Sequence, residues 1–370
     1  MKKEQIITIF RRFGVEEKIT YIEQKKNGLI NSTYYLETIN EKKYILQRIN
    51  TYVFKNPEEL MENISSVTHF LRKRIREAGG DPERETLRFC KSDQDKFYLT
   101  DEEGSAWRLY HFVDGSYTVD ETKDHEVFRN AGATFGRFMR LLNTYPAKEL
   151  HETIVDFHNT PARYETFLKS AQKNASGRKE NCPDEIKFVI DRKADTEYVM
   201  KLYENGLIPT RVTHNDSKIN NVLFDTRTNK GVCVIDLDTV MPGVSLYDFG
   251  DTLRSGANNT REDDANLDNV FFDLDLFRSY TEGFLSETAD CLTKAEKENL
   301  PFGVKLMTFE CGIRFLTDYL DGDVYFRTDY PEHNIVRARN QFRLVEDIEK
   351  KYDEMQKIVN ECLKKYSADS

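Results

Sequence analysis

The six cysteines of this 370-residue chain include no CxxC pair, so their spacing indicates neither a zinc site nor a disulfide framework. We therefore expect free thiols in a reducing compartment, the cytoplasm. Long apolar runs are also missing. Runs such as Val232–Ile235 fall far short of the roughly 20 residues that a membrane span requires. Arg11 and Arg12 interrupt the apolar residues near the start, so we expect no secretion signal.

An excess of positive charge is absent as well. The chain has 54 Lys and Arg against 64 Asp and Glu, a formal net charge of −10. Proteins that coat nucleic acid or anionic lipid need a cationic surface, so we expect neither as a partner. A local basic cleft for one phosphorylated ligand stays compatible with this balance. Hydrophobic residues make up 39% of the chain, enough for a sizeable core, and its length favours two lobes.

The first third of the sequence is rich in strand patterns. A helix should start at Asn56-Pro57, with Asn as the N-cap, and end at Gly79-Gly80. Asn27-Gly28 predicts a turn between the first two strands. The expected strands are Ile19–Glu23, Thr33–Glu37, Lys43–Ile49, Thr86–Cys90, Phe97–Thr100 and Ala106–Val113. This order indicates an antiparallel sheet with one inserted helix, an α+β lobe over residues 1–113.

The remainder, residues 114–370, is predicted to be larger and mostly helical. Gly132 and Gly136 lie four residues apart in a predicted helix, where we expect another backbone to pack closely. Two short strands should interrupt the helices. The expected helices are Val127–Leu142, Phe302–Leu320 and Ile335–Cys362, and the strands are Val222–Phe224 and Val232–Ile235.

The most informative stretch has the form H-x-D-x-x-x-x-N and leads into a strand. It contains His214, Asp216 and Asn221, and a second strand ends at Asp236. Phosphoryl transfer needs a carboxylate that accepts the acceptor's hydroxyl proton, together with hard oxygen ligands that hold Mg²⁺ on the nucleotide. The pattern predicts that Asp216, Asn221 and Asp236 meet at one edge of a hairpin. His214 would fix the loop backbone through its ring.

A plainer interpretation of these residues is a polar turn built on Asx hydrogen bonds. The hydrophobic strand that ends in an aspartate 20 residues after Asp216 favours the catalytic interpretation. Asp238 is equally compatible with a capping carboxylate and with a second contact to metal or sugar.

The segments His214–Asn221 and Val234–Asp238 resemble the catalytic pair of the aminoglycoside phosphotransferase and choline kinase superfamily. The longer string Ile235–Arg254 is similar to the N-acetylhexosamine 1-kinases, as are Tyr44–Asn50 and Arg314–Phe326. The resemblance spans residues from about 20 to about 350. It implies a bilobal, protein-kinase-like fold with a nucleotide-binding first lobe and a catalytic, substrate-binding second lobe.

The resemblance also implies residue roles. Asp216 would be the catalytic base, Asn221 and Asp236 the Mg²⁺ ligands, and Asp248 the aspartate that steadies the catalytic loop. The implied ATP contacts are Arg48 on a strand, the hinge backbone at His111 and Val113, and the phosphate loop at Asn31 and Ser32. A glutamate of the inserted helix should support Arg48, and Glu62 is preferred to Glu59. The implied substrate contacts are Arg314, Asp251 and Arg254.

Some positions leave alternatives open. The loop Lys25–Thr33 contains one glycine, unlike a glycine-rich phosphate loop, and Leu29 and Ser32 stand where the sugar-kinase relatives would have more polar residues. Arg48 is also compatible with an exposed strand arginine, because Gln47 alternates with it. Arg314 is compatible with a surface ion pair to Asp318.

The motif and its resemblance to the N-acetylhexosamine 1-kinases thus imply an ATP- and Mg²⁺-dependent kinase that phosphorylates the C1 hydroxyl of an N-acetylhexosamine, working as a monomer or a homodimer. The same fold acting on choline, ethanolamine, homoserine or an aminoglycoside is the alternative. A protein kinase is disfavoured because little chain separates Asp236 from Asp248 and no A-P-E signature follows. A non-catalytic relative is disfavoured because the motif is intact. A glycoside hydrolase would leave Asn221 without a role.

Overall fold

The computed structural model describes residues 2–25 and 30–367 and divides into two compact units. The predicted turn at Asn27-Gly28 and the position of Leu29 lie outside the described residues. Unit 1 comprises Met1–Tyr117, Thr144–Val155 and Leu223–Met241, and unit 2 comprises Thr118–Asn143, Asp156–Val222 and Pro242–Ser370. The lobe boundary after residue 113 stays a prediction. Within the described part of the chain, no helix is long and apolar enough to cross a membrane.

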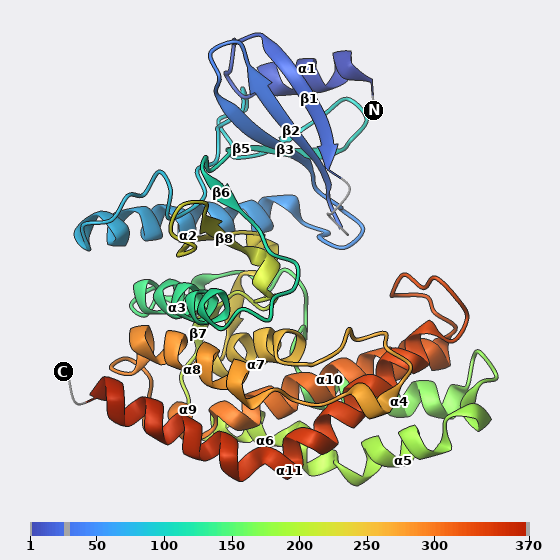
Figure 1. Ribbon diagram of the computed structural model, residues 1–370. Coiled ribbons are helices and arrows are strands. Elements are labelled where there is room, and N and C mark those ends of the chain that lie inside the picture. Colours follow the sequence, from blue (N-terminus) through green and yellow to red (C-terminus); the bar gives the residue numbers. More distant parts are fainter. Residues whose placement is uncertain (1, 26–29, 368–370) are drawn as a thin grey trace. The chain divides into compact units, whose positions relative to one another are not determined.

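Unit 1 is built on a five-stranded antiparallel sheet, drawn in blue and teal in Figure 1. Its strands, in spatial order, are β1 (Ile19–Lys25), β2 (Ser32–Thr38), β3 (Lys43–Arg48), β5 (Ala106–His111) and β4 (Leu99–Thr100). Helix α1 (Lys3–Arg11) buries Ile6, Ile9 and Phe10 in the same apolar cluster as Leu36, Leu46 and Trp107 of the sheet. The predicted α+β first lobe is confirmed.

The inserted helix α2 (Pro57–Glu77) begins as its sequence predicts. The Asn56 side chain accepts hydrogen bonds from the backbone N–H groups of Glu58 and Glu59, and Pro57 occupies the first turn. The strand expected at Thr86–Cys90 is wrong, because only Phe89 forms a β-bridge, to Tyr110 of β5. The residues around it have strand-forming side chains but no regular ladder.

The buried side chain of Asn63 contacts all three chain segments that make up unit 1. Asn63 of α2 donates to the carbonyl oxygens of His151 (2.8 Å) and Val240 (3.1 Å) and accepts from the His151 N–H (2.9 Å). The short strands β6 (Ser116–Tyr117), β8 (Val222–Asp225) and β9 (Gly231–Val234) form a second sheet, and only Val222 of β8 belongs to unit 2. Both predicted strands of this hairpin are confirmed.

Unit 2 is mostly helical, as predicted. A two-stranded ladder pairs β7 (Arg211–Thr213) with β10 (Met241–Gly243), and only Met241 of β10 belongs to unit 1. Its helices are α3 (His125–Leu141), α4 (Thr160–Lys173), α5 (Pro183–Asp191), α6 (Lys193–Glu204), α7 (Ser245–Gly256), α8 (Leu274–Thr288), α9 (Lys294–Glu298), α10 (Leu300–Asp321) and α11 (His333–Ser367).

Helices α3 and α8 pack through small residues, which confirms the expected close backbone approach at Gly132 and Gly136. A Cβ atom added at Gly132 would collide with the carbonyl oxygen of Tyr280, and one at Gly136 with that of Phe284. Gly283 of α8 is equally restricted by the Arg129 carbonyl of α3. Only glycine lets these two backbones approach so closely.

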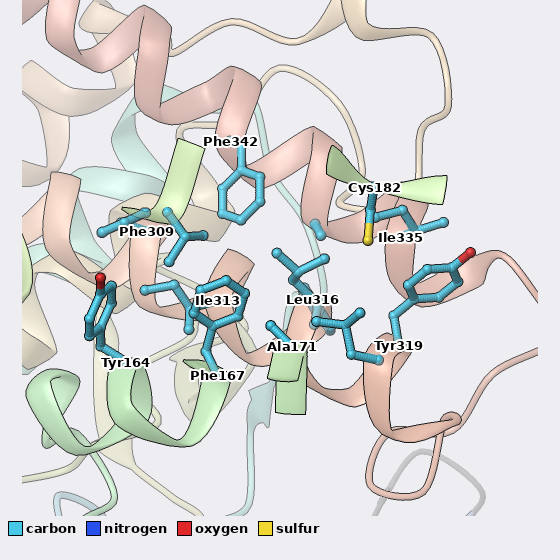
Figure 2. Packing of buried hydrophobic residues seen from close by; sticks show 14 of the residues in the cluster. Tyr164, Phe167, Ala171, Cys182, Phe309, Ile313, Leu316, Tyr319, Ile335 and Phe342 are labelled. Carbon is cyan, nitrogen blue, oxygen red and sulfur yellow. The ribbon is translucent and has the colours of Figure 1, made fainter. Parts of the chain in front are cut away.

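A large apolar cluster of unit 2 surrounds α10 (Figure 2). Phe309 and Ile313 of α10 pack with Phe167 of α4 and Phe342 of α11, and the Phe342 ring stacks on Phe188 with centroids 4.7 Å apart. This cluster fixes α10 from two sides. Helices α4 and α10 are therefore held in place by a packed apolar core.

Candidate active site

The predicted catalytic loop begins directly after β7 and is tied to α7 by hydrogen bonds. The backbone N–H groups of His214 and Asn215 donate to the two carboxylate oxygens of Asp248, each at 2.7 Å. The Ser217 hydroxyl donates to the Asp248 carbonyl oxygen at 2.6 Å, and the Thr252 hydroxyl donates to the Ser217 carbonyl oxygen. Burial raises the pKa of Asp248, while its two N–H donors act in the opposite direction. The side chain predicted to steady the loop thus contacts its backbone.

His214 is fully buried, and its ring lies edge-on to Phe135 and Phe138 of α3, with centroids 5.7 and 6.2 Å away. Its Nδ1 accepts a hydrogen bond from the Asp216 N–H at 3.3 Å. Asn215, between them, has a left-handed φ of 63°, a conformation that asparagine adopts more readily than most residues. These features hold the backbone that leads into Asp216 in one conformation.

The carboxylate of Asp216 is held by an amide and an ammonium group. Asn221, in the short 3₁₀ turn Ile219–Asn221, donates through Nδ2 to the Asp216 carbonyl oxygen (2.7 Å) and to its Oδ2 (3.3 Å). The Nζ of Lys218 lies 2.9 Å from Asp216 Oδ1. Burial raises the pKa of Asp216, but the Lys218 charge opposes burial and holds that pKa below its usual value. The carboxylate is therefore ionised at neutral pH and able to accept a proton.

Sequence reasoning missed Lys218. A signal was available, because a cation two residues after the predicted base reaches the carboxylate across the loop. The Asp216 carboxylate in turn raises the pKa of Lys218, which therefore stays charged. The loop thus carries one proton acceptor and one fixed positive charge, side by side.

The predicted metal ligands have the right donor atoms. Asn221 uses its amide nitrogen within the loop, which leaves the amide oxygen as the donor for a cation. Asp236 follows β9 in a left-handed conformation, φ 57°, and is exposed. Asn221 lies in unit 2 and Asp236 in unit 1, so their joint use by one metal stays a prediction.

Asp238 is the buried partner of an arginine that sequence reasoning did not single out. Arg108 of β5 forms an ion pair with Asp238 through Nη1 and donates through Nε to Gln47 Oε1 at 2.9 Å. Asn31 donates to the other Asp238 oxygen at 2.6 Å and accepts from the Asn50 N–H at 2.9 Å. Asp238 therefore connects the sheet of unit 1 to the segment after β9. Nothing in the local sequence pairs residues 108 and 238, which explains the omission.

The structure does not bring Arg48 and Glu62 together. Arg48 is exposed at the end of β3, opposite Ser32 of β2, whereas Gln47 faces Arg108 across the ladder. Glu62 is also exposed, and its carboxylate lies 2.7 Å from His151 Nε2. The ATP contacts assigned to these two residues stay predictions.

The hinge positions lie at the end of β5 and just after it. The His111 N–H donates to the Arg88 carbonyl at 3.0 Å, and the Val113 carbonyl accepts from the Ser116 hydroxyl at 2.6 Å. The contacts to adenine expected from the backbone at His111 and Val113 stay predictions. Burial lowers the pKa of the His111 side chain to about 4, so the ring is neutral at pH 7.

The predicted substrate residues all belong to unit 2. Arg254 and Asp251 are buried and bound to each other, with Nε and Nη2 each 3.2 Å from Asp251 Oδ1. The Arg254 charge also contributes to lowering the pKa of Asp216. Arg314 is not paired with Asp318. The Asp318 carboxylate instead accepts from the backbone N–H groups of residues 324–326 and from Asn334.

Comparison with known proteins gives a family and a fold. A family model described as the phosphotransferase enzyme family matches residues 22–283. A microcompartment-associated aminopropanol kinase has a similar structure, with a TM-score of 0.63 and 15% identity over 96% of this chain and 99% of that chain. A choline kinase from Cryptosporidium parvum Iowa II gives a TM-score of 0.58 and 14% identity, covering 98% of this chain and 99% of its own.

A third similar structure is an amicoumacin kinase in complex with AMP-PNP, Ca²⁺ and Ami. It gives a TM-score of 0.57 and 17% identity over 95% of this chain and 94% of that one. At these identities the likeness shows the fold alone. The predicted kinase-like fold is thereby confirmed.

Proposed function

This chain belongs to the phosphotransferase enzyme family, and on that premise we propose that it transfers the γ-phosphate of ATP to the C1 hydroxyl of an N-acetylhexosamine. The family supports phosphate transfer to a hydroxyl of a small molecule. The sugar and the position of phosphorylation are the finer part of the proposal, and they rest on the sequence resemblance of Ile235–Arg254 and Arg314–Phe326.

The observation that carries the proposal is the state of Asp216. Its carboxylate is ionised, its backbone is held by hydrogen bonds, and it lies at the start of a loop that ends in a potential metal ligand, Asn221. Such a carboxylate orients the acceptor hydroxyl and takes its proton as the phosphate is transferred. The fixed loop supplies the positioning on which phosphoryl transfer chiefly depends.

Asn221 and Asp236 would hold Mg²⁺, because an amide oxygen and a carboxylate are the hard oxygen donors that this ion prefers. The ion would neutralise charge on the nucleotide phosphates. Lys218 lies close enough to Asp216 to place a further positive charge beside the group that is transferred. Asp248 and His214 would act through the loop backbone and contact no substrate.

The test is a panel of acceptors incubated with ATP and Mg²⁺. The panel contains N-acetylglucosamine, N-acetylgalactosamine, their methyl glycosides, choline, ethanolamine, homoserine and an aminoglycoside, and ³¹P NMR locates the new phosphate. We expect a C1 phosphate on the free sugar and none on its methyl glycoside, which lacks the C1 hydroxyl proton that Asp216 would accept.

Two results would count against the assignment. A phosphate at C6 would mean that the site presents the sugar in the opposite orientation. Turnover of choline, homoserine or an aminoglycoside without sugar turnover would leave the phosphotransferase standing and would remove the sugar.

A further inference from the structure

The peptide unit that joins Asn215 to Asp216 is held at both ends by buried imidazole rings of unit 2. Its N–H group, which belongs to Asp216, donates to His214 Nδ1 at 3.3 Å. Its carbonyl oxygen, which belongs to Asn215, lies 3.0 Å from Nε2 of His158, a residue just before α4 and 57 positions earlier in the chain. Two hydrogen bonds, one at each end of a peptide unit, fix the orientation of its plane.

Both ring nitrogens of His158 face hydrogen-bond acceptors. A carbonyl oxygen can only accept, so Nε2 is the donor to Asn215. Nδ1 lies 2.7 Å from Glu310 Oε1, and the other oxygen of this carboxylate accepts from the Thr160 hydroxyl at 2.6 Å. Two acceptors around one ring require a proton on each nitrogen, which makes the ring an imidazolium.

The electrostatics of the pair agree with this geometry. Burial lowers the pKa of His158, but the charge and the hydrogen bond of Glu310 outweigh burial and raise that pKa above its usual value. Burial raises the pKa of Glu310, and the His158 charge and hydrogen bond in turn hold it below its usual value. Besides Glu310 on α10, the carboxylates that interact with the His158 charge are Asp248 and Asp251 of α7.

The ion pair is enclosed by the protein. His158 is 8% exposed and Glu310 1%, and the imidazole lies against the rings of Phe157 and Tyr247 with centroids 4.6 and 5.3 Å away. A buried ion pair contributes little net stability, because the loss of water offsets the attraction between the charges. What this pair supplies is a hydrogen-bond donor of fixed position beside the catalytic loop.

The opposite end of the same residue is bound by α7. The Asn215 N–H donates to Asp248 Oδ1 at 2.7 Å, so both polar groups of the Asn215 backbone are bound to buried charged side chains. Asn215 has a left-handed φ of 63°, which persists in a residue other than glycine only when its surroundings hold it. His158 and Asp248 together provide that restraint.

We propose that His158 is a positioning residue for the catalytic base Asp216, with Glu310 as the group that holds its ring. The inference rests on the proposed function, because it concerns the base of the same phosphotransfer. His158 acts through the Asn215 carbonyl and contacts no substrate. Without this donor, the peptide unit before Asp216 keeps one of its two hydrogen bonds and leaves a carbonyl unpaired, so the loop rearranges and the carboxylate is displaced.

The experiment compares two replacements of His158 that differ in their ability to donate. Glutamine places an amide N–H near the position of Nε2, whereas leucine fills the buried space without a donor. Turnover is measured with ATP, Mg²⁺ and the acceptor of the panel that the wild-type enzyme uses fastest. His158→Leu should lower kcat by on the order of 10²-fold, the cost of a small displacement of a reacting group. His158→Gln should keep kcat at least about fivefold above that of His158→Leu, and KM for ATP should change little in both.

A second measurement needs no turnover. ¹⁵N NMR of the wild-type protein labelled at histidine shows which ring nitrogens carry protons, and the His158 signal is the one missing from the spectrum of His158→Gln. We expect protons on both nitrogens at neutral pH. In Glu310→Gln the amide can donate to Nδ1, so the ring should lose its charge and keep its donor to Asn215.

His125→Leu is the matched control and should leave kcat unchanged, because His125 is exposed at the start of α3 in the same unit and lies 3.0 Å from Ser279 Oγ. A leucine variant at least as active as the glutamine variant would overturn the positioning role and leave the proposed function standing. A singly protonated His158 ring in the wild-type protein would do the same. Failure of the wild-type enzyme to phosphorylate any acceptor of the panel would overturn both.

Discussion

At the scale of single residues, charge pairing decides the chemistry of the site. Asp216 keeps a lowered pKa chiefly because the charge and hydrogen bond of Lys218 oppose the effect of its burial, with smaller contributions from His214 and Arg254. Asp248 forms no such ion pair within the described part of the chain, and its pKa is raised. Its role is to hold the loop backbone, whose N–H groups donate hydrogen bonds to its carboxylate. Two aspartates on neighbouring segments are thus suited to different tasks by their surroundings.

Replacement of Lys218 by Met should shift the acid limb of the kcat/KM profile to higher pH. The wild-type Asp216 ionises below its usual pKa, and loss of the ammonium group leaves the burial that raises it. Activity that depends on the ionised form is then lost at a higher pH as the solution is acidified. The measurement is the pH dependence of kcat/KM with the best acceptor. An acid limb at the wild-type position would show that Lys218 does not control Asp216.

At the scale of secondary-structure elements, close packing positions the helices around the catalytic loop. Helix α3 supplies the rings that enclose His214, and its glycines lie against α8. Such contacts have no room for an added methyl group unless one helix moves. The same helix pair therefore contributes both to stability and to the position of the loop.

Gly283→Ala should destabilise the protein by about 1–3 kcal/mol, the usual cost of overpacking a well-packed core. The new Cβ atom would collide with the Arg129 carbonyl, which belongs to the backbone of α3 and cannot rotate away. Urea unfolding measures the effect. Ser286→Ala, at an exposed position on the same helix, is the control and should change stability by less than about 0.5 kcal/mol. Equal stability of the two variants would mean that α3 and α8 are not tightly packed.

At the scale of the whole molecule, the features that depend on residues close together in the sequence were predictable. Short stretches of sequence determine three of these features. They are the cap at Asn56, the strands of the first sheet and the order of the motif from His214 to Asn221. The alternation of apolar and polar residues indicates a strand, and apolar residues at helical spacing indicate a helix. The strand expected at Thr86–Cys90 failed because strand-forming residues do not ensure a partner for a regular ladder.

The contacts that join distant segments were not predictable. The ion pair of Arg108 with Asp238 and the link from His158 to Glu310 connect residues 130 and 152 positions apart. Lys218 was within reach of local reasoning, since it lies two residues from Asp216. Motifs therefore identified the reacting group, and tertiary structure was needed to describe its surroundings.

The most direct test of the account is turnover by Asp216→Asn, measured with ATP, Mg²⁺ and the best acceptor of the panel. The amide keeps the shape of the side chain and cannot take up the proton, so kcat should fall by on the order of 10²–10⁴-fold. KM for ATP and the urea midpoint should stay near the wild-type values, and the exposed Asn220→Ala in the same loop should remain active. Near-normal turnover by a pure Asp216→Asn preparation would contradict the account.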